Sequence, residues 1–164
     1  MAGELPRPEE VGGAVWRHEW HPYEDYKTVH QRYIANLSNE GLVEEDGLTF
    51  HEYRTGRLLT RVNIAGRITC AFGVTIEVDK WLETDGASDP SVRGYAYRYH
   101  AWLARTGQEI LRYDSAHGFD RLHCHVFDLH TGQETILPCP IESLPTLDGF
   151  IRLATKKVRD AGYA

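Results

Sequence analysis

Hydrophobic residues that recur at every second position constrain this chain more than any other feature of its sequence. Over residues 68–79 they alternate with polar or small residues, and the apolar members are Ile68, Cys70, Phe72, Val74, Ile76 and Val78. Alternation of this kind is typical of an antiparallel strand that buries one face. The stretch therefore predicts a sheet with one apolar and one polar side.

A second long stretch, residues 92–103, alternates in the same way. Tyr97 and Tyr99 fall on one face, and Arg98 and His100 fall on the other. Shorter strands are predicted at residues 48–54, 58–64, 109–114, 121–129 and 135–137. Glycine-containing turns separate these segments, including one at Ala65-Gly66. The pattern indicates a meander of about six antiparallel strands.

Two segments follow the spacing of a helix instead. Residues 22–38 begin with a proline suited to a first turn, carry apolar residues on one side and precede Gly41. Residues 147–161 follow Thr146, a plausible N-cap, and place Asp148 near the positive end of the helix dipole. We therefore expect an α+β fold, with an N-terminal and a C-terminal helix packed on the antiparallel sheet.

The formal net charge of −6 lies entirely in the first part of the chain. Residues 1–50 contain ten acidic and four basic residues, whereas residues 51–164 contain fourteen of each. This division predicts an acidic N-terminal segment, residues 1–45, that contains one amphipathic helix, and an α+β body, residues 46–164. A neutral body with local basic stretches is compatible with nucleic-acid binding, which a uniformly acidic protein would disfavour.

Hydropathy and cysteine content limit the cellular setting. No apolar run approaches the roughly 20 residues that a membrane-spanning helix needs. Residues 1–13 have no continuous apolar stretch of the kind a signal peptide requires, and three cysteines do not make a disulfide framework. These features predict a cytoplasmic protein that has no membrane association.

Candidate functional residues gather in the second half of the chain. Four of the nine histidines fall within residues 117–130. On the predicted strand 121–129, His123 and His125 share one face because side chains alternate along a strand. Further polar residues that adjoining strands or loops bring to this neighbourhood are Arg98, Arg112, Asp114 and His117.

One interpretation of this cluster is metal-independent cleavage of RNA. In that reaction one histidine accepts the proton of a 2′-hydroxyl group and another protonates the leaving oxygen, which suits a side chain that titrates near neutral pH. Arg98 and Arg112 would bind the phosphate, and His117, His123, His125 and Asp114 would be catalytic. Arginines interleaved with aromatic residues over 92–113 favour a single-stranded nucleic acid.

Metal binding is an alternative interpretation of the same histidines. Two histidines two positions apart on a strand can share an ion, with His117, Asp114 or Glu134 as a third ligand. The spacing matches no metal motif closely, so we predict no cofactor and keep a histidine-rich metal-binding domain as a second alternative.

A further alternative is a protein without catalytic activity. Histidine and arginine are ordinary residues on the solvated face of a sheet. The N-terminal helix, with its apolar stripe and acidic flank, would then dock a protein partner as an interaction module.

The segment Arg112-Tyr113-Asp114-Ser115-Ala116-His117-Gly118 resembles an RYD-x-AHG motif of small uncharacterised bacterial proteins. It is also similar, more distantly, to the TumE-like toxins of toxin–antitoxin systems, in which an Arg-x-Asp-Asn-Ala element leads into a histidine-rich loop and a short helix. The resemblance covers roughly residues 58–158. It implies a small cytoplasmic α+β toxin that an antitoxin neutralises, and it carries over Arg112, Asp114, His117, His123 and His125.

Overall fold

The computed structural model describes residues 19–115, 122–140 and 144–163, and within them it contains two α-helices and a nine-stranded sheet. The helices are α1 (Tyr23–Asn39) and α2 (Leu147–Asp160). The strands are β1 (His21–Pro22), β2 (Val43–Asp46), β3 (Thr49–Thr55), β4 (Leu58–Cys70), β5 (Val74–Thr84), β6 (Ser91–Leu103), β7 (Glu109–Asp114), β8 (His123–Phe127) and β9 (Glu134–Pro138). The predicted α+β class is confirmed, and the sheet has more strands than expected.

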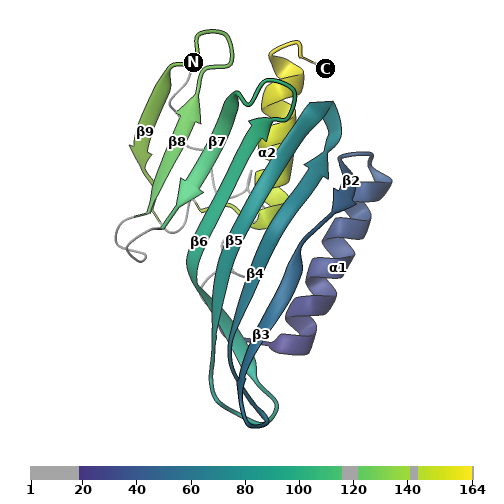
Figure 1. The fold of residues 1–164 in the computed structure, drawn as a ribbon, viewed down its shortest axis with the longest axis vertical. Helices are drawn as coiled ribbons and strands as arrows, with labels where there is room; N and C mark the ends of the chain where they lie inside the picture. The colour runs from purple at the N-terminus through teal and green to yellow at the C-terminus, as the bar shows by residue number, and fades with distance from the viewer. Residues whose placement is uncertain (1–18, 116–121, 141–143, 164) are drawn as a thin grey trace.

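Every strand pair in the sheet is antiparallel. The main path runs β2-β4-β5-β6-β7-β8-β9, while β3 also pairs with β4 and β1 pairs with one end of β6. From β4 to β9 the order in space follows the order in sequence, as expected for a meander. The central strands are long and twist together in Figure 1.

Both helices cover the same face of the sheet (Figure 1). Leu37 of α1 and Phe150 and Ile151 of α2 join one core with the alternate residues of the central strands, such as Ile76 and Tyr99. Tyr23, at the start of α1, belongs to a second buried cluster nearer the tip of the sheet. The apolar side of α1 therefore packs on the body of the protein, and the described residues place no helix over the opposite face of the sheet.

The predicted helix ends agree with the structure to within one residue. Thr146 caps α2 by accepting a hydrogen bond from the Gly149 amide. The C-cap of α1, Glu40, forms a two-pronged ion pair with Arg152 of α2 at 2.6 and 2.8 Å. The Arg152 guanidinium holds the pKa of the Glu40 carboxyl below its usual value. No helix among the described residues is long and apolar enough to cross a membrane.

The predicted turn at Ala65-Gly66 is wrong. Strand β4 continues through Gly66, where φ is +138° and the backbone passes close to that of Gly47. The chain reverses instead at residues 71–73, within the segment predicted as one strand. The alternation of apolar residues does not reveal this hairpin, because the connection is three residues long. Apolar residues before and after it therefore still fall at every second position of the sequence, as they would in one continuous strand.

Candidate functional site on the open face of the sheet

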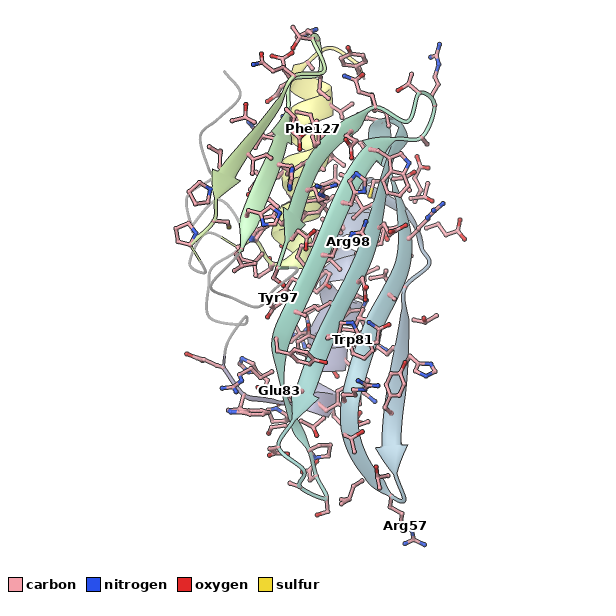
Figure 2. All side chains as sticks on the ribbon, turned by 60° about the vertical axis from the view of Figure 1, so that its left-hand side comes forward. Arg57, Trp81, Glu83, Tyr97, Arg98 and Phe127 are labelled. Atoms are coloured by element: carbon pink, nitrogen blue, oxygen red, sulfur yellow. The ribbon has the colours of Figure 1, made fainter. Side chains whose placement is uncertain are left out.

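The register of the central strands brings most of the candidate residues to the face opposite the helices. His100, Arg112 and His125 lie side by side on β6, β7 and β8. Two residues further along the strands, Arg98, Asp114 and His123 form a parallel row. Positions two apart on a strand share a face, so both rows lie on the same side of the sheet. Figure 2 looks onto this open face, with Arg98 near the middle of β6 and the helices behind.

His125 is the most enclosed member of the two rows, with 7% of its side chain exposed. Its Nδ1 contacts the Glu134 carboxylate from β9. The Arg112 guanidinium approaches the same ring, at 3.0 Å from Nε2 and 3.3 Å from Nδ1. A neutral imidazole has one donor and one acceptor nitrogen. The contacts fit a ring that donates from Nδ1 to Glu134 and accepts at Nε2 from Arg112.

His123 lies beside His125, and the two ring centroids are 4.8 Å apart at an angle of 65°. His123 is half-buried, and it lies opposite Asp114 of the neighbouring strand β7. Two imidazoles at this separation can reach one bound group, which is the arrangement that paired acid and base catalysis needs.

His100 extends the first row toward the centre of the sheet. Its Nε2 lies 2.9 Å from the Glu109 carboxylate, and Glu109 is also 4.0 Å from Arg112. Burial lowers the pKa of His100. The positive charges of Arg112 and Arg98 lower it further, whereas the Glu109 carboxylate raises it by less than these effects together lower it. His100 is therefore held toward its neutral form.

Five of the six candidate residues thus share one face: Arg98, Arg112, Asp114, His123 and His125. The sixth, His117, lies outside the described residues, as do Ala116 and Gly118 of the same motif. Arg98 is exposed, and no ion pair to it is formed within the part of the chain that the structure describes. An exposed guanidinium of this kind is suited to binding an anion such as phosphate.

Sequence reasoning missed the two carboxylates that hold the histidines. The sequence pattern does not assign Glu109 to the site, and it suggests Glu134 only as a possible third metal ligand. Both become visible only once the register is known, because Glu134 reaches His125 from the neighbouring strand and Glu109 reaches His100 in the same way. The histidine–carboxylate pairs give the cluster a fixed orientation that histidines alone would lack.

The described residues offer no ready metal centre. Across residues 19–115, 122–140 and 144–163, no group of three or more histidine, cysteine or carboxylate side chains is arranged to hold a metal ion. In the described cluster, His125 is occupied by a carboxylate and a guanidinium, and a guanidinium cannot ligate a cation.

Comparison with known protein families identifies the family of this chain. The family model described as "Toxin TumE" matches residues 30–159, which is more than three quarters of the chain. The chain belongs to the TumE toxin family. The match includes the C-terminal part of α1, the whole of β2 to β9 and nearly all of α2, and it confirms the resemblance to TumE-like toxins. The searches of curated proteins and of solved structures found no match.

Proposed function

We propose that this TumE-family protein is a toxin that cleaves RNA with the histidine and arginine residues of the open face. The observation that carries the proposal is the pairing of His123 and His125 at 4.8 Å between ring centroids, with Arg112 in contact with His125. An antitoxin partner that restrains the activity belongs to the same proposal.

In the proposed reaction, the 2′-hydroxyl oxygen of a nucleotide attacks the adjacent phosphorus. One imidazole accepts the hydroxyl proton, and the other, as an imidazolium, donates a proton to the departing 5′-oxygen. The products are a 2′,3′-cyclic phosphate and a 5′-hydroxyl end, so neither water nor an oxidant is consumed. Glu134 keeps His125 oriented, as carboxylates do for catalytic histidines elsewhere.

The two arginines have a separate role in this proposal. Charge accumulates on the non-bridging phosphate oxygens as the phosphorus becomes five-coordinate, and guanidinium groups stabilise that charge. Arg98 is exposed and ready for this contact. Arg112 would exchange its hydrogen bond to His125 for one to phosphate, which frees Nε2 of His125 when substrate binds. Asp114, opposite His123, would orient that ring, and His117 remains a further proposed acid or base.

The test is growth arrest upon induced expression in a bacterial host. Replacing both histidines, His123→Ala with His125→Ala, is expected to restore colony formation to the level of an empty vector. His130→Ala is the matched control, because His130 is exposed in the turn between β8 and β9, and this variant should remain toxic. Circular dichroism of the purified variants checks that both are folded. A folded double variant that is as toxic as the parent would refute the site.

RNA as the target is tested separately with purified protein. Incubation with total RNA in excess EDTA should produce fragments that carry cyclic phosphate ends, and the double histidine variant should produce none. Toxicity that persists without any RNA cleavage would leave the family membership intact and reject RNA as the substrate.

A further inference from the structure

The open face carries a second group of side chains, away from the histidines, on β3, β4 and β5. The rings of Tyr53 and Trp81 are stacked, with centroids 5.7 Å apart and planes inclined by 29°. The Arg61 guanidinium lies over both rings, at 4.5 Å from the Tyr53 centroid and 5.0 Å from the Trp81 centroid. We call Tyr53, Arg61 and Trp81 the aromatic–arginine cluster.

Register places the aromatic–arginine cluster on the same face as the candidate site. Trp81 is two residues from Asp79, and Asp79 lies opposite Arg98. Arg98 lies opposite Asp114 on the next strand, and Asp114 lies opposite His123 on the strand after that. With strands about 4.8 Å apart and about 3.3 Å of rise per residue, the backbone of Trp81 lies about 16 Å from that of His123. In Figure 2, Trp81 follows Arg98 along the length of this face.

Charge pairing around the cluster leaves two cations available. The acidic residues of β5 on this face are each engaged: Glu77 with Arg67, Asp79 with Asn63 and Glu83 with Arg93. Within the described residues, neither Arg61 nor Arg98 has a carboxylate within ion-pair distance. These two guanidinium groups therefore complement phosphate, one at the cluster and one between the cluster and the histidines.

We infer that the aromatic–arginine cluster is a binding site for single-stranded RNA, which stacks one or more unpaired bases against Tyr53, Trp81 and Arg61 while the strand continues past Arg98 to the histidines. This inference rests on the proposed action on RNA. Proteins bind unpaired bases by stacking them on aromatic rings and on arginine guanidinium planes. Paired bases in a duplex cannot offer their faces in this way, so the site selects single strands.

The experiment is a fluorescence anisotropy titration with a labelled single-stranded RNA of about 12 nucleotides, a length within the range covered by single-strand-binding folds. The probe carries 2′-O-methyl groups, which remove the nucleophile and prevent cleavage. The double variant Tyr53→Ala with Trp81→Ala should raise the Kd at least about tenfold. Trp81→Phe keeps a ring and should bind nearly as the parent does. Tyr163→Ala, which removes an exposed ring at the end of α2, is the matched control and should change nothing.

A charge variant keeps the inference testable even where the double alanine variant does not fold. Arg61 is exposed, so Arg61→Gln is expected to fold, to weaken binding and to reduce the slope of log Kd against log salt by about 0.7. Tight, ring-independent binding by a folded double alanine variant would overturn this inference and leave the cleavage site standing. Equal affinity of the parent for a duplex would also overturn it. A parent protein that binds no RNA probe would overturn both this inference and the proposed substrate.

Discussion

The Arg112 guanidinium lies 3.0 Å from Nε2 of His125, across the pair formed by β7 and β8. The other ring nitrogen of His125 faces Glu134 on β9. Three neighbouring strands thus fix one imidazole between a cation and a carboxylate. The contribution of each of these two neighbours of His125 can therefore be tested separately by substitution.

Replacement of Arg112 should reduce toxicity and RNA cleavage. A hydrogen bond to a charged group contributes about 1.5–3 kcal/mol, so Arg112→Ala is expected to slow cleavage by about tenfold to a hundredfold. Arg112→Lys keeps the charge but lacks the planar fork and should recover only part of the rate. The measurement is the initial rate of cleavage of a fluorogenic RNA. Arg105→Ala, exposed in the turn after β6, is the control, and equal rates for both alanine variants would reject a role for Arg112.

Glu134→Gln tests the orientation of His125 without removing any ring. The amide is nearly isosteric with the carboxylate but cannot provide its negative charge to Nδ1 of His125. We expect cleavage to fall at least about tenfold, by analogy with carboxylates that position catalytic or metal-bound histidines. The Glu134 side chain is 43% exposed, so the free energy of unfolding should change by only about 0.5 kcal/mol. Unchanged cleavage with unchanged stability would show that Glu134 has no positioning role.

Much of the site could be predicted because alternation alone fixes the face of each residue within a strand. His123 and His125 had to share a face once β8 was recognised, and Arg112 and Asp114 had to share one on β7. The relation between the two strands depends on register, which no local pattern in these strands specifies. Glu134 and Glu109 were missed for that reason. His117 belongs to a segment that the structure does not describe, so its place in the site stays a prediction.

The fold shows the same division between local and long-range information. The ends of α2 follow from the Thr146 cap and a strong apolar stripe, and both were predictable. The course of β4 was not, because Gly66 was interpreted as a turn residue. Its real function is to permit close contact between two backbones, and that contact joins residues far apart in sequence.

Gly66→Ala should therefore destabilise the protein strongly. A Cβ at this position would lie 2.3 Å from the Gly47 carbonyl oxygen, and φ of +138° is unfavourable for any residue with a side chain. Both effects together are expected to lower the free energy of unfolding by about 2–4 kcal/mol. Gly56→Ala is the matched control, because Gly56 has φ of +61° and open space around it, and it should lose only about 1 kcal/mol. Urea unfolding measures both, and equal losses would contradict the close backbone contact.

The lowered pKa of His100 predicts how the stability of the protein changes with pH. Burial, aided by Arg112 and Arg98 and opposed by Glu109, lowers the pKa of His100 below its usual 6.5. The unfolded chain therefore binds the proton at a higher pH than the folded chain does. As pH falls through 6.5, protonation favours the unfolded state, and this loss ends once the pH is below the folded pKa. Thermal unfolding at pH 7 and pH 5 should show a smaller loss of Tm in His100→Gln than in the parent, whereas His51→Gln, an exposed histidine of β3, should behave as the parent does. An identical loss of Tm in parent and His100→Gln would show that His100 does not contribute to this pH dependence.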